Sequence, residues 1–328
     1  MRPTFLPRLV NGPLFDPVVY LKILNERISL LFDCGRIQGL ANREVLSLNS
    51  IFISHMHMDH FIGMDQVLRI ILHRDQPIHV YGPEGITEKM LSKLRAYSWN
   101  LTRHYLLEVI IHEIGPFAVL TTHSPAHSGF EVSSQECRET DTHRIAHHPR
   151  FFVDAAMLDH NLACLCFVLK EPFHVNIRSD MIRKKGYRTG PWIGRFKECV
   201  LSGCLEEAIR VPMLRGEQDL RVNELMDELI LTSPGQKIAY ITDIRYSPEN
   251  IDRIQKIARE PDVLFIEAYY LHECSDTAYE KGHLTAHQAG MIGKTLGAKR
   301  VVPMHVSPRY HHRMEEIHAE LSRALESS

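Results

Sequence analysis

A dense supply of metal-binding side chains lies in the segment SHMHMDH, which contains His55, His57, Asp59 and His60. It follows the apolar segment SIFIS (50–54), which we expect to be a buried strand, and precedes an apolar segment of helical period. Alternate side chains of an extended segment share a face, so residues 55, 57 and 59 can converge, and a histidine at the helix start can turn inward. Imidazole and carboxylate are ligands that zinc and similar ions prefer. The alternative interpretation is a solvated loop, because the 21 histidines of the chain also produce accidental motifs.

Three later segments that we expect to be strands supply further ligands near their ends. His160 lies in LDHNLACL, Asp243 ends KIAYITD, and His305 lies in RVVPMHV. Taken singly, each is more often a core, surface or capping residue than a ligand. Together they complete two sets: His55, His57 and His160 for one ion, Asp59, His60 and His305 for the other, and Asp243 as a bridge. A site for two cations needs such a bridging carboxylate. His123 and His127 are rivals of His160, whose strand context is the better match.

Six motifs in a fixed order carry a family resemblance. The segments SHMHMDH, LDHNLACLCFVL, AYITDI, VLFIEA, GHLTAHQAG and MHVSPRY, from about Ser29 to Tyr310, resemble the metallo-β-lactamase superfamily and most closely its RNase Z branch, the tRNA 3′-processing endoribonucleases. The resemblance implies an α/β protein, an αββα sandwich forming one domain over residues 1–328. It also implies the ligand division given above and two divalent metal ions. His and carboxylate ligands suit Zn²⁺ first, with Mn²⁺ or Fe²⁺ as alternatives.

The resemblance further implies a general acid in the GHLT motif, here His283, supported by Glu267. From the residues alone, Glu267 in the apolar segment FIEAYY would be costly to bury without a cationic partner, and a Glu–His pair removes that cost. A purely structural hydrogen bond between the two is the alternative. We expect catalysis to involve Asp59, His283 and Glu267.

The predicted chemistry is hydrolysis of a phosphodiester. Two cations lower the pKa of a shared water enough to give hydroxide at neutral pH and stabilise the added negative charge of the transition state. The expelled alkoxide needs a proton, which we assign to His283. The resemblance implies a specific reaction, the endonucleolytic removal of 3′ trailers from precursor tRNA by a metal-bridged hydroxide. Alternatives are a hydrolase of a small phosphodiester, ester or thioester without a tRNA role, and a metal-stabilised RNA-binding scaffold without turnover.

The surrounding segments alternate between strand and helix patterns, as in layered α/β proteins. Strands are predicted over 17–25, 27–35, 50–54, 77–82, 151–160, 161–170, 237–243, 262–270 and 300–306, and helices over 64–73, 84–99, 250–260 and 285–297. The first two strands are expected to form a hairpin around Asn25 and Glu26. The polar, His-rich stretch 123–150 is predicted to be a long loop.

An inserted arm is predicted over 172–232, where the alternation breaks. Residues 172–200 contain seven Lys or Arg against two acidic residues, in a chain of net charge −2. We expect this arm to bind substrate through Lys184, Lys185, Arg188 and Trp192, because basic groups contact phosphates and aromatic rings stack on bases. The arm's GPW segment and its place after His160 look like the flexible tRNA-binding arm of RNase Z. A solvated helix surface is the alternative.

Composition and net charge limit the binding partners and the cellular compartment that we expect. The 328 residues are 44% hydrophobic, and the net charge of −2 gives no global reason to bind polyanions or membranes. The seven cysteines form no CxxC pair, which favours a reducing compartment, and no long apolar run is present. We therefore expect a cytoplasmic protein that binds RNA or a small phosphodiester. A homodimer is implied by the resemblance only. Three segments depart from the RNase Z pattern, LVNGPLFDP, TDIRY and GHLT. The resemblance implies that these segments lie around the substrate and not on the metal ions.

Overall fold

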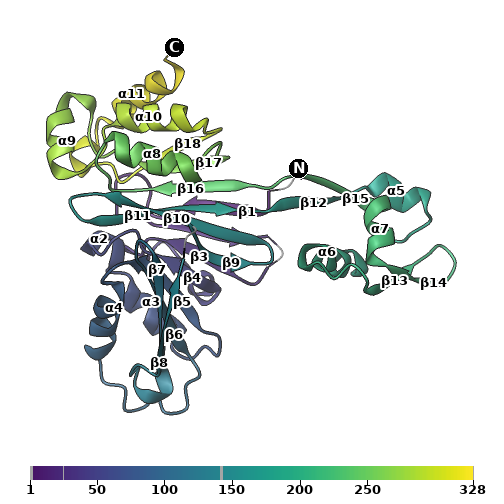
Figure 1. The fold of residues 1–328 in the computed structure, drawn as a ribbon. Helices are drawn as coiled ribbons and strands as arrows, with labels where there is room; N and C mark the ends of the chain where they lie inside the picture. Colours follow the sequence, from purple (N-terminus) through teal and green to yellow (C-terminus); the bar gives the residue numbers. More distant parts are fainter. Residues whose placement is uncertain (1–2, 25, 141–142, 328) are drawn as a thin grey trace. The chain divides into compact units, whose positions relative to one another are not determined.

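The computed structural model describes residues 3–24, 26–140 and 143–327. The chain divides into two compact units. The larger contains residues 1–145, 153–169 and 237–328, and the smaller contains 146–152 and 170–236 (Figure 1). Within the described ranges, no helix is long and apolar enough to cross a membrane.

The first sheet of the larger unit has eight strands in sequence order. They are β1 (Phe5–Leu9), β2 (Val19–Ile23), β3 (Ser29–Phe32), β4 (Leu48–Phe52), β5 (Ile78–Pro83), β6 (Glu108–Ile114), β7 (Ala118–Pro125) and β8 (Ser134–Glu139). The strands β3 to β6 run parallel, and those at the two edges pair antiparallel. The predicted hairpin of β2 and β3 is confirmed, although Asn25 lies outside the described residues.

The second sheet has six strands in the order β18-β17-β16-β11-β10-β9. Their bounds are β9 (Arg144–His148), β10 (Phe151–Asp159), β11 (Ala163–Lys170), β16 (Lys237–Ile241), β17 (Val263–Glu267) and β18 (Val301–Met304). The last three are parallel. Their carboxyl ends therefore meet at one edge of the sheet, where Asp243, Glu267 and His305 stand at or just after the strand ends.

Helices cover the outer face of each sheet, and aromatic rings fill the space between the sheets. On β3, Leu31 packs in the cluster that contains the helices α3 (Met64–Ile71) and α4 (Ile86–Arg95), while Phe32 points the other way. On β16, Ala239 and Ile241 pack with α8 (Pro248–Ile257), α10 (Ala286–Leu296) and α11 (Met314–Glu326), while Tyr240 faces Phe32 at 5.6 Å between ring centroids. This alternation is the period-two pattern of buried strands. The result is an α/β fold with two mixed sheets (Figure 1).

The smaller unit has a core of its own. It contains β12 (Phe173–Ile177) paired antiparallel with β15 (Ile230–Pro234), and β13 (Ala208–Pro212) paired with β14 (Glu217–Arg221). Three helices complete it: α5 (Ser179–Lys184), α6 (Trp192–Ser202) and α7 (Val222–Leu229). Trp192, Phe196 and Leu225 are among the buried residues of its apolar cluster.

The predicted loop over 123–150 is wrong. The described part of this stretch contains the end of β7 and the strands β8 and β9. All six side chains of β8 are exposed, so the strand has no buried face and shows no apolar alternation. It lies at the edge of the first sheet, where polar side chains are common. The strands β1 and β6 were also not anticipated, and α4 is shorter than the helix predicted over 84–99.

Candidate metal centre

The structure brings all seven sequence-predicted ligands together within the larger unit. His55 follows β4, His57 precedes the short helix α2 (Met58–Phe61), and Asp59 and His60 lie within α2. His160 follows β10, and Asp243 and His305 follow β16 and β18. Strands of both sheets therefore deliver ligands to one place, and loops at their ends leave the side chains free to converge.

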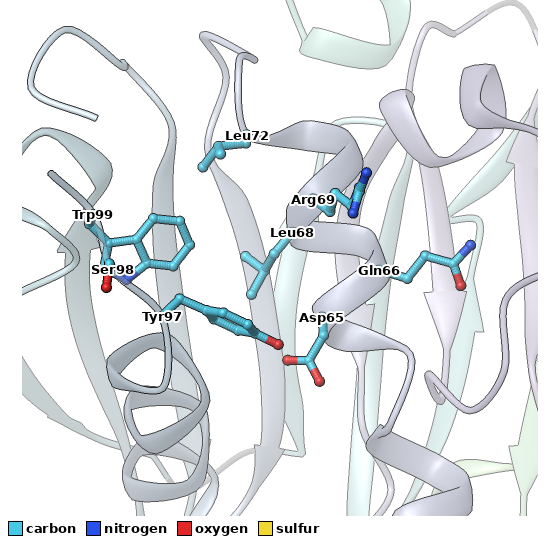
Figure 2. Close-up of a pocket in the computed structure, with 8 residues that line it drawn as sticks. All are labelled: Asp65, Gln66, Leu68, Arg69, Leu72, Tyr97, Ser98 and Trp99. Carbon is cyan, nitrogen blue, oxygen red and sulfur yellow. The ribbon is translucent and has the colours of Figure 1, made fainter. Parts of the chain in front are cut away.

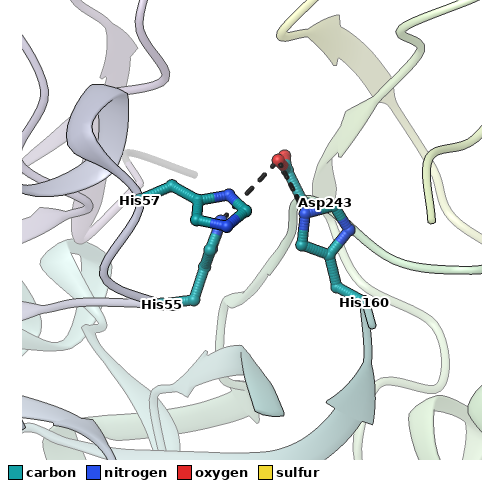
Figure 3. A group of neighbouring side chains, drawn as sticks. All are labelled: His55, His57, His160 and Asp243. Atoms are coloured by element: carbon teal, nitrogen blue, oxygen red, sulfur yellow. Dashed lines mark ion pairs between the residues drawn. The ribbon is translucent and has the colours of Figure 1, made fainter. Parts of the chain in front are cut away.

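One group of ligand atoms surrounds Asp243. His55, His57, His160 and Asp243 each offer an atom, and these atoms lie within 4.8 Å of one another (Figure 3). The Nε2 atoms of His55 and His160 are 3.8 and 3.5 Å from Asp243 Oδ2. This is the first of the two sets that the sequence predicts.

A second group shares the same carboxylate. Asp59, His60 and His305 each offer one ligand atom, and these three atoms also lie within 4.8 Å of one another. His305 Nε2 is 3.1 Å from Asp59 Oδ2, and His305 Nδ1 is 2.6 Å from Asp243 Oδ1. His60 Nε2 is 3.5 Å from Asp243 Oδ2, so Asp243 lies between the two groups.

The donor set fits divalent cations. Nε2 of His55 and Nε2 of His60 are buried and have no hydrogen-bond partner among the described residues. An unpaired buried polar atom costs about 1–3 kcal/mol. Both atoms are directed toward Asp243, and a bound cation would remove the cost at each. The clusters are therefore consistent with a binuclear metal site.

Buried groups behind the ligands fix their orientation. The Nδ1–H of His60 donates to Asp33 Oδ2 at 2.7 Å, and the Nδ1–H of His160 donates to the Gly282 carbonyl at 2.6 Å. These contacts leave Nε2 of each ring for a metal, as outer contacts of metal-binding histidines commonly do. Ser54 and Tyr240 also donate hydroxyl hydrogen bonds to Asp33, each at 2.7 Å. Sequence reasoning missed Asp33, although an acidic residue directly after the apolar run SLLF (29–32) is a detectable anomaly.

Backbone strain concentrates around the same ligands. Asp33, Asn161 and His305 have φ values of 53°, 60° and 52°, in the left-handed region that residues other than glycine rarely occupy. Each such residue costs on the order of 1–3 kcal/mol and persists only where its surroundings impose it. Gly282 also has a positive φ, 73°, and a Cβ there would meet His160 Nδ1 at 2.9 Å. Only glycine fits this position without displacing the His160 ring.

His283 and Glu267 form the pair that the sequence suggests. His283 Nδ1–H donates to Glu267 Oε2 at 2.9 Å, and the ring stacks on Tyr269 at 4.2 Å between centroids. The other oxygen of the fully buried Glu267 accepts from the backbone N–H groups of Ile244 and Leu284, at 2.8 and 3.2 Å. These bonds keep Glu267 fixed behind the ring. Both residues also belong to a cluster with Asp243 and His305.

The electrostatics of the cluster place positive charge beside Asp243. Burial by itself would lower the pKa of His60, but the carboxylates of Asp243 and Asp33 outweigh it and raise this pKa well above its usual value. Burial also opposes the shift at His305, where Asp243 and Asp59 raise the pKa to about 10. At His55, burial and the charge of His60 lower the pKa to about 2. Protons thus occupy part of the cluster in the metal-free protein, and cations would displace them.

Arg245, in the unusual turn TDIRY, holds the segment that carries His160. Its backbone N–H donates to the Asp159 carbonyl at 2.9 Å, and its guanidinium pairs with the Asp159 carboxylate at 3.4 Å and contacts Asn161. The same guanidinium lies 4.9 Å from the ring centre of Tyr279 in α9 (Ser275–Lys281). Arg245, which departs from the family pattern at this turn, therefore contacts the residues immediately before and after His160.

The predicted substrate-binding residues lie in the smaller unit. Lys184, Lys185 and Arg188 are all exposed. Lys184 Nζ lies 4.0 Å from Asp180 Oδ2, and Lys185 pairs with Glu228. Trp192 is only 6% exposed, and its Nε1–H donates to the Arg188 carbonyl at 2.7 Å. The ring packs in the apolar cluster near Phe196, so it offers no free face for stacking on a base. Residues 201–232 carry seven acidic and three basic side chains, and the whole segment 172–232 has a net charge of only +1.

The rival histidines do not enter the cluster. His123 lies on β7, where its Nδ1 is 3.1 Å from Glu108 Oε1, and His127 lies in the short helix of Ala126–Ser128. Neither belongs to a candidate metal group of the described residues, whereas His160 does.

Comparisons with known proteins agree with this geometry. A family described as "Beta-lactamase superfamily domain" matches residues 202–306. A protein of Deinococcus radiodurans named Ribonuclease Z is 30% identical over 284 residues, which cover 86% of this chain and 83% of that protein. A protein of Proteus mirabilis named Ribonuclease BN is 27% identical over 323 residues, covering 94% of this chain and 90% of the other.

Solved structures show the same fold. The structure of human tRNase Z, short form, has a TM-score of 0.55 and 20% identity, with 93% of both chains covered. The metallo-β-lactamase fold protein YhfI from Bacillus subtilis also gives a TM-score of 0.55, at 13% identity, covering 98% of this chain and 92% of that one. At these identities the similarity concerns the fold.

Proposed function

The chain belongs to the metallo-β-lactamase superfamily and is related to ribonuclease Z, and from this premise we propose that it is a two-metal phosphodiesterase that removes 3′ trailers from precursor tRNA. The proposal is carried by two observations taken together, the similarity to a relative and the convergence of the ligands. A relative named Ribonuclease Z covers 86% of the chain, and the predicted ligands converge on one buried carboxylate.

We assign one cation, zinc in our proposal, to His55, His57 and His160, the other to Asp59, His60 and His305, and the bridge to Asp243. Bound divalent cations supply a lowered water pKa and stabilise negative charge on a phosphate. Asp33 and the Gly282 carbonyl keep the rings of His60 and His160 in the tautomer that presents Nε2.

We assign proton donation to His283. Glu267 accepts from Nδ1, so Nε2 of the ring is left for the substrate. Burial would lower the pKa of His283, but the charge and hydrogen bond of Glu267 outweigh it and raise this pKa. The ring therefore holds a proton that it can pass to the departing 3′-oxygen of the upstream RNA. The products would be a 3′-hydroxyl and a 5′-phosphate.

The deciding experiment is cleavage of a 3′-extended precursor tRNA by the zinc-loaded protein, beside bis(p-nitrophenyl) phosphate as a small diester. Cleavage just after the discriminator nucleotide would support the processing role. Turnover of the small diester alone would refute that role and keep the hydrolytic site. Absence of both activities in metal-loaded protein would refute the proposal as a whole.

The second candidate function is hydrolysis of a small phosphodiester, ester or thioester. It is favoured by the charge of segment 172–232, which is almost neutral, and by the ion pairs that engage Lys185 and Arg195. In the tRNA proposal, residues 172–232 form the inserted arm, and its RNA contacts come from exposed groups such as Lys184 and Arg188. Deleting the arm would discriminate, because it should reduce tRNA cleavage and spare small diesters. The homodimer stays a prediction from the resemblance.

A further inference from the structure

A concave site outside the metal clusters lies in the larger unit, between α3 and the segment that follows α4. It has a volume of about 540 Å³ and is lined by Asp65, Gln66, Leu68, Arg69, Leu72, Tyr97, Ser98 and Trp99 (Figure 2). Volumes of several hundred Å³ are typical of sites for small organic groups. None of these residues belongs to the metal clusters.

Two aromatic rings form one side of this pocket. Trp99 is fixed, because its Nε1–H donates to the Leu94 carbonyl at 2.7 Å and its ring packs edge-on against Phe130 at 4.7 Å. Tyr97 is 49% exposed, and its ring lies 5.9 Å from that of Trp99 at an angle of 68°. Figure 2 shows its hydroxyl directed toward Asp65. A fixed and an accessible ring beside apolar Leu68 are suited to contact a planar aromatic group.

Of the remaining lining groups, Leu72 is apolar, and the other four are polar and differ in charge. Asp65 pairs with Lys93 at 2.9 Å, and Gln66 next to it adds an amide. Arg69 is exposed and forms no ion pair with any residue that the structure describes. A carboxylate and an amide can hydrogen-bond the edge of a base, and a free guanidinium suits a phosphate. The combination matches a nucleotide better than a purely apolar ligand.

The pocket is close to the metal centre along the chain. Asp59 is a predicted ligand, and Asp65 lies six residues later, in the next helix. Even a fully extended chain of six residues spans at most about 22 Å, and helical residues span less. A short single-stranded segment of RNA can therefore reach both places.

We propose that this pocket binds a nucleobase of a single-stranded segment of the RNA substrate, with the ring against Tyr97 and Trp99 and the adjoining phosphate at Arg69. The inference rests on the proposed function as far as the RNA is concerned. Binding of a nucleobase in this pocket can be tested separately from RNA cleavage.

The first test compares KM for precursor tRNA and for bis(p-nitrophenyl) phosphate in Tyr97→Ala and Arg69→Ala. In Tyr97→Ala, loss of a base–aromatic stack should raise KM for the RNA by about 5- to 150-fold, and in Arg69→Ala loss of the phosphate contact should raise it too. The small diester carries no base, so its kinetics should not change. Phe117→Ala is the matched control, because Phe117 is an aromatic residue 77% exposed outside the pocket. Unchanged KM for the RNA in both pocket variants would overturn the proposal.

The second test uses adenosine, which has no phosphate and hence little affinity for the metal ions. Adenosine should quench the fluorescence of Trp99 in a saturable way, and Tyr97→Ala should weaken or abolish the effect. The chain has one other tryptophan, the buried Trp192, so Trp99→Phe identifies the source of the signal. If the protein cleaves no RNA, quenching that depends on Tyr97 still supports a nucleobase pocket, whereas absence of quenching overturns it.

Discussion

The metal centre of the larger unit and the basic segment of the smaller unit were both predicted from residue types, and they differ in how the structure uses those residues. At the centre, buried strands end in ligands whose partners are also buried, such as Asp33 behind His60. In the basic segment, Lys185 and Arg195 lie on the surface and pair with acidic residues from later in the chain. The position of a residue at the end of a buried strand therefore predicts where its side chain lies. A run of basic residues in the sequence does not show which acidic residues will pair with them. The variants below test this contrast.

The largest effect is expected for Asp243→Ala. This change removes the carboxylate that both clusters share and leaves His60 and His305 without their main counter-charge. Metal content should fall from two ions to less than one per chain, and hydrolysis should be lost. Metal analysis after gel filtration measures this. Asp252→Ala, on the surface of α8, is the control, and equal metal content in both variants would contradict the assignment.

His283→Ala should separate chemistry from metal binding. Metal content should stay near that of the unchanged protein, while kcat on precursor tRNA falls by about 10²- to 10⁴-fold, the usual contribution of a general acid. The exposed His311 provides the matched control, His311→Ala. An unchanged kcat would show that the leaving oxygen takes its proton from elsewhere.

Asp33→Asn tests whether a buried residue behind a ligand matters. The amide keeps the size of the side chain but weakens the bond from His60 Nδ1–H, so metal affinity should fall by about 10- to 100-fold. A competition titration with a chromophoric chelator gives the affinity. Tyr240→Phe removes one of the other hydrogen bonds to Asp33 and should have the smaller effect.

The pH dependence of the metal-free protein should reveal the protons that cations displace. The pKa of His305 is raised to about 10 in the folded state, above its usual value of about 6.5. Its contribution to stability is therefore complete below pH 6.5 and is lost as the pH rises toward 10, by at most about 1.4 kcal/mol per pH unit. The Tm of chelator-treated protein should fall over this range. In the proposed assignment His305 is a neutral ligand of the metal-loaded protein, which should therefore show a smaller decrease. An equal decrease in both would refute the assignment.

The smallest effect is expected in the smaller unit, for Arg188→Ala. A single exposed phosphate contact should change the affinity for RNA only about two- to five-fold and reduce the slope of log K against log salt by about 0.7–0.9. Kinetics on the small diester should be unaffected. A change on the small diester of the same size would show that Arg188 acts on folding instead of on RNA.

The sequence predicted many of the elements whose hydrophobic pattern is strong, although it missed the apolar strand β6. The segments around Phe52, Phe167 and Tyr240 alternate between two buried faces, and each was placed correctly. The exposed edge strand β8 was not, because no face of it is buried. At the site, residue types and strand ends indicated the ligands. Asp33 was missed although its place directly after the apolar run SLLF was detectable, whereas the carbonyl of Gly282 could not be anticipated. A backbone oxygen carries no side-chain identity, and its position depends on contacts between segments distant in the chain.

Gly282 couples the orientation of His160 to the position of His283, and this coupling restricts which substitutions the centre can accept. Its carbonyl orients His160, its lack of a side chain leaves space for that ring, and the next residue along the chain is His283. A mutation that moves this peptide to adapt the position of the proton donor to a new leaving group would also turn a predicted metal ligand. Selection for new substrates should therefore leave residues 282–283 unchanged and act through the residues around the centre.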